Sequence, residues 1–254
     1  MIPDAVPIIG VHVRERWPDL STDMDNIEAH FREYEELFVA VFVPEPDPTG
    51  DPALSLRDKT RLLVISVTAH ARALTWSLID AINRDSPQAA FLLLRAHFEV
   101  AGMMAHVLVH LRKYVAGESS AKDFHEVVIR LLLGTRKHPA GASQDLIART
   151  TATNVLTFVN AVDKVGLSSG GQFREAWEML SEFCHPNTFS RVISGQRRVE
   201  QAMHFDMNPS ILLESITSIL PASLIAQETF LFCRQEAAAL TEQMAADVSG
   251  TEDH

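Results

Sequence analysis

Apolar residues recur along most of the chain at the three- and four-residue spacing of helices. No separated runs of alternating apolar and polar residues with hairpin turns accompany them, so a sheet is not expected to be a major part of the fold. The pattern predicts helices over about residues 23–43, 55–84, 87–114, 120–135, 146–165, 172–184 and 210–246. The fold class is therefore all-α, a single-domain bundle of about seven helices.

The second and third of these helices are apolar around most of their circumference, as expected for helices surrounded by neighbours. Asp85, Ser86 and Pro87 separate them by a very short connection, in which proline suits the first turn of the next helix. We therefore expect an antiparallel hairpin at the centre of the bundle. Pro221 should kink or divide the last helix.

The segments without a helical period set the domain limits. Residues 1–22 are expected to form an irregular N-terminal arm, residues 23–247 the helical bundle and residues 248–254 a disordered tail. The proline-rich stretch at 44–52 reads as an exposed loop, and residues 186–208 as irregular.

Composition narrows the class of protein. The chain has 254 residues, of which 46% are hydrophobic, and a formal charge of −11. The negative charge argues against constitutive, non-specific binding to nucleic acid, which depends on a basic surface. Two cysteines without metal or redox spacing, and no visible signal peptide, indicate a reduced, cytoplasmic protein.

Two apolar stretches, residues 62–82 and 89–111, approach the length needed to cross a membrane. Both contain ionisable residues, and the second has Arg95 and Glu99 near its middle, where charge in lipid is costly. Buried helices of a soluble bundle explain the two stretches better, so no membrane association is expected.

A polar stripe on the third helix is the most informative candidate site. Arg95, Glu99, His106 and His110 share one face when each residue advances about 100° around the axis. Buried charges need partners. One interpretation is structural: an Arg95–Glu99 salt bridge, with the two histidines at the exposed C-terminal end of the helix.

The other interpretation is a polar pocket inside the bundle. Arg95 would bind an anion or a phosphate, and Glu99 would act as an acid, a base or a metal ligand. His106 and His110 could join as ligands, because imidazoles four residues apart can converge on one ion. His70, on an apolar helix, is a candidate for a supporting contact to this stripe across the hairpin.

A second polar feature lies where the sixth helix stops. Glu182 and His185 have the Glu-x-x-His spacing of di-iron bundles, and Asn187 follows at the turn. Those proteins need the motif twice, and no second copy is found in a suitable helix. His185 could equally cap the carbonyl end of the helix.

The segments Leu92-Leu-Leu-Arg-Ala-His-Phe-Glu99 and Leu180-Ser-Glu-Phe-Cys-His-Pro-Asn187 together resemble a group of bacterial all-helical proteins of unknown function. Some of that group are considered relatives of HEPN-type domains. The resemblance implies a helical bundle in which Arg95, Glu99, His185 and Asn187 approach one another, and these are the candidate catalytic residues.

The wider HEPN group includes dimers and RNases that use an Arg-x(4–6)-His motif. Here the candidates for that motif are Arg197 or Arg198 with His204, in a segment without a predicted helix. This departure from the RNase pattern counts against nuclease activity.

Three functions stay open, so the sequence does not decide whether the chain is an enzyme. The first is a HEPN-like stress or defence protein with a polar pocket around Arg95, Glu99 and His185, whose ligand would be RNA or a nucleotide. The second is a hydrolase that uses a divalent metal ion. Its candidate ligands are Glu99, His106, His110, Glu182 and His185.

The third function is a non-catalytic, dimeric scaffold. A homodimer is expected in any case, because the last helix carries more apolar residues than a peripheral helix needs. These residues are Ile216, Ile219, Leu220, Leu224, Phe230 and Phe232.

Overall fold

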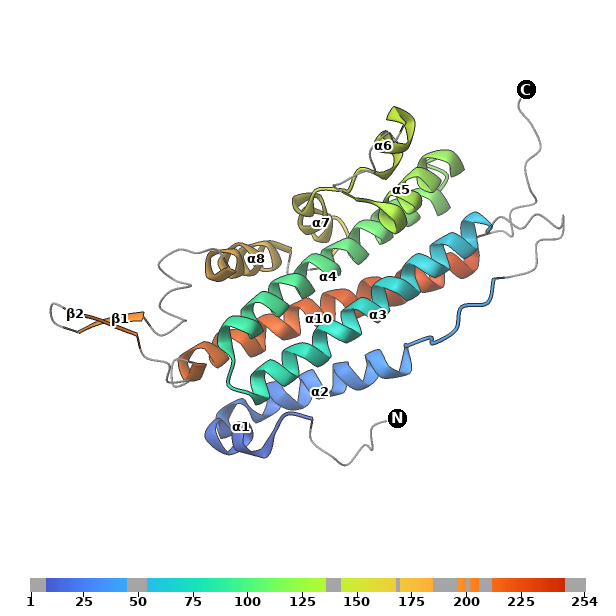
Figure 1. The fold of residues 1–254 in the computed structure, drawn as a ribbon. Coiled ribbons are helices and arrows are strands. Elements are labelled where there is room, and N and C mark those ends of the chain that lie inside the picture. The colour runs from blue at the N-terminus through green and yellow to red at the C-terminus, as the bar shows by residue number, and fades with distance from the viewer. Residues whose placement is uncertain are drawn as a thin grey trace, which may run out of the picture.

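Long apolar helices that need neighbours on several sides account for the architecture. The computed structural model describes residues 8–44, 54–135, 143–167, 170–184, 196–199, 202–205 and 212–244. At its centre, α3 (Leu56–Asn83), α4 (Pro87–Val115) and α10 (Leu212–Gln243) run side by side (Figure 1). The all-α bundle that the sequence predicts is confirmed, and α3 and α4 form the expected central hairpin.

Shorter elements cover the two sides of this centre. On one side lie α1 (Val11–Arg16), a 3-10 turn (Pro18–Leu20) and α2 (Ser21–Glu36), and on the other lie α5 (Ala121–Leu133), α6 (Gln144–Thr150), α7 (Val155–Val162) and α8 (Gly170–Cys184) (Figure 1). The strands β1 (Gln196–Val199) and β2 (Ala202–Phe205) pair antiparallel.

Local sequence explains several helix starts. The side chain of Ser55 accepts a hydrogen bond from the backbone N–H of Asp58, and Ser120 does the same for Asp123. Each serine thereby satisfies one of the backbone donors that a helix start leaves without a partner. In the tight α3–α4 connection, Asp85 adopts a positive φ of 52° and Pro87 opens α4.

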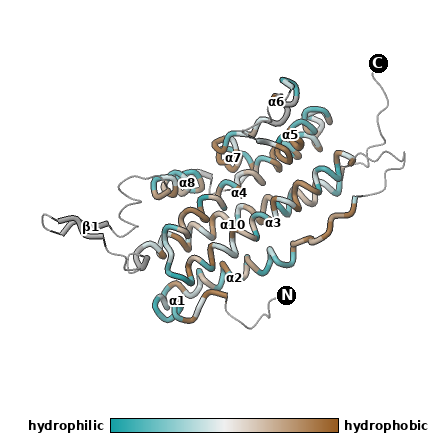
Figure 2. Tube along the Cα trace, in the orientation of Figure 1, coloured by the Kyte–Doolittle hydropathy of each residue, from teal (hydrophilic) through white to brown (hydrophobic). Residues whose placement is uncertain are grey.

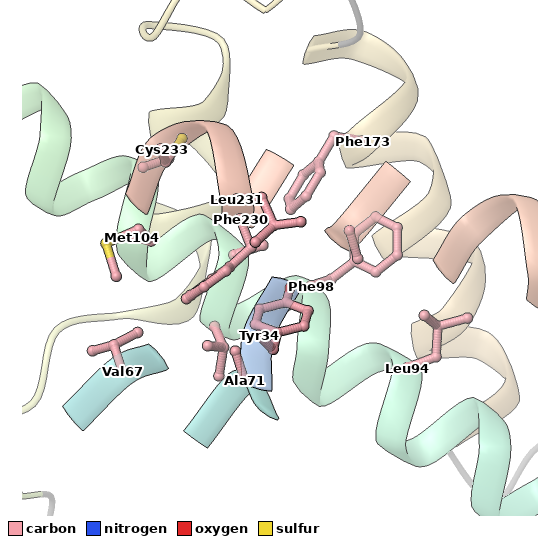
Figure 3. Close-up of a cluster of buried hydrophobic side chains, with 14 of the residues drawn as sticks. Tyr34, Val67, Ala71, Leu94, Phe98, Met104, Phe173, Phe230, Leu231 and Cys233 are labelled. Atoms are coloured by element: carbon pink, nitrogen blue, oxygen red, sulfur yellow. The ribbon is translucent and has the colours of Figure 1, made fainter. Parts of the chain in front are cut away.

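Aromatic side chains from different helices meet in the core. Tyr34 of α2 packs against Phe230 of α10, with ring centroids 5.3 Å apart, and Phe98 of α4 against Phe173 of α8, at 4.6 Å (Figure 3). All four side chains are almost fully buried. One continuous core therefore joins the central helices to the elements on both sides.

The N-terminal segment is tied to the bundle by buried polar groups, where the sequence predicted an irregular arm. The carboxylate of Glu28 accepts hydrogen bonds from the backbone N–H groups of Ile8 and Ile9, and from Arg14. The side chain of Asn83 accepts from the N–H of Gly10. These contacts fix the chain that leads into α1, a helix too short to show a clear period.

Several predicted boundaries were wrong. The first predicted helix ends at Glu36, seven residues early, and the predicted helix at 146–165 is divided into α6 and α7. The segment read as irregular contains the β1–β2 hairpin. The proline-rich loop beyond Pro44 and the tail at 248–254 lie outside the described residues.

The last helix differs most from expectation. It continues through Pro221 without dividing, and it lies in the centre against α4, α2 and α3. The apolar residues that suggested a dimer surface are buried or partly buried inside this single chain. That argument for a homodimer was therefore wrong, although the oligomeric state itself is a separate question.

Three helical segments are long and apolar enough to cross a membrane by length and composition: α3, α4 and residues 215–243 of α10. They are also the helices that pack together at the centre. Within their apolar windows, 56% of α4 and 61% of α10 is buried, against 44% of α3. Mutual burial therefore accounts for much of the hydrophobicity of α4 and α10.

Gly102 allows α4 and α7 to approach closely. A Cβ atom at this position would lie 2.8 Å from the backbone carbonyl carbon of Phe158 and 2.9 Å from its oxygen. Real Cβ atoms do not come so near to backbone, so even alanine would force the helices apart.

We predict that Gly102→Ala lowers the free energy of unfolding by roughly 1–2 kcal/mol, because overpacking outweighs the helix propensity gained. Gly171→Ala is the matched control, since open space surrounds Gly171 in the first turn of α8. It should be neutral or stabilising by up to about 1 kcal/mol. Denaturant unfolding measures both, and equal effects of the two substitutions would contradict the close approach.

Candidate functional site

The polar stripe of α4 faces the elements that cover this helix, α8 toward its first half and α7 toward its second. Arg95 and Glu99 lie on the α8 side, whereas His106 contacts Phe158 of α7, with ring centroids 5.5 Å apart. Gly102 lies between the two pairs on the same stripe. The stripe is thus split into two polar regions by the close contact with α7.

Arg95 and Glu99 form the ion pair that their spacing predicts. Nε of Arg95 lies 3.2 Å from Oε1 of Glu99, and both side chains are about three-quarters buried. The alignment is too poor for a hydrogen bond, so the buried Nε of Arg95 has no hydrogen-bond partner in the described part of the chain. The guanidinium also lies 5.8 Å from the centre of the Trp177 ring of α8.

The end of α8 is fixed beside this pair. Phe183 stacks on Phe91 of α4 at 4.4 Å, and the thiol of Cys184 lies 3.8 Å from the backbone oxygen of Phe91. Burial raises the pKa of Cys184, Arg95 acts in the opposite direction, and Glu99 raises this pKa further. The thiol is therefore protonated at neutral pH, which does not suit a nucleophile.

The expected partners from the second motif are only partly visible. His185 and Asn187 lie outside the described residues. Cys184, which immediately precedes His185, lies against Arg95 and Glu99, so the two motifs do meet in space. Glu182, in the same last turn of α8, is exposed.

His106 and His110 form a separate histidine pair. Their rings are 4.5 Å apart, and His106 is buried rather than at an exposed helix end, which corrects the structural interpretation of the sequence. Burial lowers the pKa of His106 to about 4, with smaller contributions from His110, Lys164 and Arg130. Burial also lowers the pKa of His110. Both imidazoles are neutral near pH 7.

The predicted metal ligands do not converge in the described residues. No group of three or more His, Cys, Asp or Glu side chains there could hold a metal ion. Of the predicted set, only His106 and His110 are neighbours, and Glu99 is two helical turns away from His106. The four described candidates therefore make no metal site among themselves, and the fifth, His185, is outside the described residues.

Sequence reasoning missed a buried polar pair, Tyr34 and His97. The hydroxyl of Tyr34 lies 3.1 Å from Nε2 of His97, and both side chains are fully buried. His97 is two residues from Arg95, so it points about 200° around the helix, away from the stripe. In the sequence, His97 is visible only as an isolated polar residue on an apolar helix face, and that pattern does not show that Tyr34 is its partner.

His70 does not support the stripe. It lies on the exposed outer face of α3, together with Ser66 and Ser77. The side chain of Ser66 donates to the backbone oxygen of Leu62 in its own helix. The predicted contact across the hairpin was wrong, because the period of a helix so apolar does not reveal which side faces outward.

The Arg197–His204 pair lies on a hairpin. In the register of β1 and β2, Arg197 is directly opposite His204, and Arg198 is opposite Met203. The segment is thus a strand pair and not a helix, in agreement with the absence of a predicted helix there.

The buried histidines make stability depend on pH. Burial lowers the pKa of His97 to about 3, with a smaller effect of His70. Between about pH 6.5 and these lowered values, the unfolded chain binds protons at His97 and His106 that the folded chain does not, so protons favour unfolding. At pH 5 each histidine lowers the free energy of unfolding by about 2 kcal/mol.

We predict that His106→Leu loses about 2 kcal/mol less than the wild type between pH 7 and pH 5, because it removes one of these imidazoles. Denaturant unfolding at the two pH values measures the difference. Tyr34→Phe is the control: it removes a contact of His97 but no imidazole, and should lower stability by about 1 kcal/mol at both pH values. A wild-type pH dependence in His106→Leu would refute the assignment.

The Arg95–Glu99 region has the chemistry of an anion site. A guanidinium offers five N–H donors, and here Glu99 is the only ion-pair partner in the described residues. The indole N–H of Trp177 is also buried without a hydrogen-bond partner there.

Neither protein-family models, nor curated protein sequences, nor solved structures give a match to this chain.

Proposed function

We propose that this chain is a cytoplasmic, HEPN-like bacterial protein of stress or defence that binds a phosphate group of RNA or a nucleotide at Arg95. The observation that carries this proposal is the state of the Arg95 side chain. It is largely buried, lies near Trp177, and has one poorly aligned carboxylate as its ion-pair partner in the described residues. Its Nε–H has no acceptor there, and a guanidinium can make a planar, two-point contact with a phosphate.

Trp177 supports a ligand that carries more than a phosphate. Its ring is near the guanidinium, and its buried N–H lacks an acceptor in the described part of the chain. A buried donor without an acceptor costs free energy, which a ligand oxygen would recover. Indole faces also stack on nucleobases. A nucleotide supplies both the acceptor and the base.

Glu99 is the candidate acid or base of this site, and it also balances the charge of Arg95 while no ligand is bound. Cys184 contacts the same region, and His185 and Asn187 follow it in the chain. We therefore propose His185 and Asn187 as further ligand contacts. The strongly negative chain makes the binding local, through one guanidinium, and not through a basic surface.

We predict that Arg95→Gln weakens binding of a short single-stranded RNA and of ATP by about 10- to 100-fold, because a charge-assisted, two-point contact is lost. Fluorescence anisotropy and calorimetry measure the two affinities. Arg174→Gln is the matched control, because Arg174 and Glu178 form the same i,i+4 pair on an exposed face of α8. It should bind like the wild type.

Two further outcomes separate the alternatives. If Arg95→Met with Glu99→Leu folds and leaves activity in a cell assay unchanged, the pair is a packing device, and the scaffold function replaces this proposal. Elemental analysis of the chain purified without chelator tests the metal-dependent hydrolase. Stoichiometric metal that is lost in both Glu99→Ala and His185→Ala would overturn the phosphate-binding assignment.

Homodimerisation is a second part of the proposal, and a different surface from the one first considered now supports it. The segment after α2 is hydrophobic (Figure 2), and most of its residues are exposed. The guanidinium of Arg72 on α3 lies 4.6 Å from the centre of the Phe38 ring, so this segment starts against α3. We define this apolar patch as Phe38, Val39, Val41 and Val43.

Light scattering at micromolar concentration should give the mass of a dimer, because apolar surface gathered in one patch is removed from water on association. Val41→Asp should shift the mass toward the monomer, since it introduces a charge into the patch. Leu156→Asp, an exposed leucine on α7, should not. A wild-type monomer under these conditions would contradict the dimer.

A further inference from the structure

A pocket lies at the C-terminal end of α4, separate from the Arg95 region. The pocket has a volume of about 300 Å³ and lies between the last turns of α4, the turn that follows it and the turn after α7. The side chains that line it are Val109, Arg112, Lys113, Ala116, Glu118 and Lys164. It is about 27 Å along the helix from Arg95, at 1.5 Å for each residue.

Arg112 is a fixed wall of this pocket. Its Nη1 donates to the backbone oxygen of Val165 at 3.0 Å, and its Nη2 donates to Glu236 of α10 at 3.2 Å. These contacts hold the turn after α7 against α4 and α10 and neutralise the guanidinium. The part of the pocket wall that Arg112 forms is therefore fixed before any ligand enters.

Lys113 and Lys164 are different, because the described residues give neither ammonium group an ion-pair partner. Both line the same pocket, although they come from different elements. Both also act on the nearby imidazole of His110. Burial is the largest cause that lowers the pKa of His110, and Lys113 and Lys164 lower it further. Two unpaired cations that share one pocket in a chain of charge −11 are a local reversal of its overall charge.

The other lining groups limit what this pair of cations can bind. Val109 and Ala116 add apolar surface to the lining, which a bare inorganic ion would leave uncovered. The carboxylate of Glu118 repels a second anionic group and accepts a hydrogen bond from a hydroxyl. The lining therefore fits a ligand with one phosphate, a short carbon skeleton and hydroxyl groups.

We propose that this pocket binds a small hydroxylated organic phosphate, whose phosphate contacts Lys113 and Lys164, whose carbon skeleton lies on Val109 and Ala116, and whose hydroxyl donates to Glu118. The site is independent of the function proposed for Arg95. It sits where α4, α7 and α10 are joined through Arg112, so an occupied pocket stabilises that junction.

The test uses ribose 5-phosphate and inorganic phosphate as probes, titrated into the full chain carrying Arg95→Gln. This background removes phosphate binding at the α4–α8 region from the signal. Calorimetry should show that ribose 5-phosphate binds more tightly than inorganic phosphate. Lys113→Gln and Lys164→Gln should each weaken its binding about ten-fold, the effect of one charge-assisted hydrogen bond.

Lys122→Gln is the matched control, because Lys122 is an exposed lysine of α5 outside the pocket. It should bind ribose 5-phosphate like its parent, and circular dichroism confirms that all three lysine variants fold. NMR gives a second measurement on the chain with its lysines intact. The bound phosphate should raise the pKa of His110, because it opposes the effect of Lys113 and Lys164.

Other titratable and charged groups also affect the pKa values of these imidazoles. They are His106 on α4 itself, Lys164 after α7, and Arg130 of α5, which acts on His106. The proposal is overturned if ribose 5-phosphate does not bind at concentrations up to about 10 mM. It is also overturned if Lys113→Gln, Lys164→Gln and Lys122→Gln bind ribose 5-phosphate with equal affinity. Binding in the wild type that Arg95→Gln alone abolishes would assign the phosphate to Arg95 and exclude this pocket.

Discussion

The structure depends on α4, the helix that packs against α3, α5, α7, α8 and α10. Its apolar residues pack against α3 and α10, and its remaining face packs against α7 and α8. This arrangement requires a point where two backbones nearly touch, and Gly102 provides it. The polar stripe of α4 is therefore divided at Gly102, with Arg95 and Glu99 before it and His106 and His110 after it.

Polar groups in this fold divide into those that the chain satisfies and those that it leaves open. Glu28 is buried, yet it accepts hydrogen bonds from two backbone N–H groups and from arginine, so its charge is compensated by the fold. Arg95 differs in how it meets its carboxylate: Arg14 donates to Glu28 through Nη2, whereas Nε of Arg95 lies 3.2 Å from Glu99 without an aligned hydrogen bond. A structural role explains Glu28 completely, whereas it leaves part of Arg95 unexplained.

The sequence predicted the features that depend on local pattern. Helical spacing gave the fold class, and the short break at Pro87 gave the central α3–α4 hairpin. The i,i+4 spacing gave the Arg95–Glu99 pair. Local pattern did not place the end of the sixth helix near that pair, because nothing local connects Cys184 with Phe91.

Features that depend on packing between distant segments were not predictable in the same way. A helix that is apolar all round, such as α10, can lie at the periphery of a dimer or at the centre of a monomer, and its period is the same in both. Likewise, the side of α3 that carries His70 faces outward only because α2, α4 and α10 occupy the other sides. The Tyr34–His97 pair joins residues 63 positions apart, for which one sequence contains no signal.

The central position of α10 also determines the order in which the fold can be assembled during synthesis. Residues 212–243 leave the ribosome after α2, α3 and α4, which pack on them. Until then the faces of α2, α3 and α4 that pack on α10 have no partner, so the nascent chain presents apolar surface. Folding is therefore completed late, once the C-terminal helix is available, and the growing chain carries for longer the exposed apolar surface that makes a folding intermediate prone to aggregate.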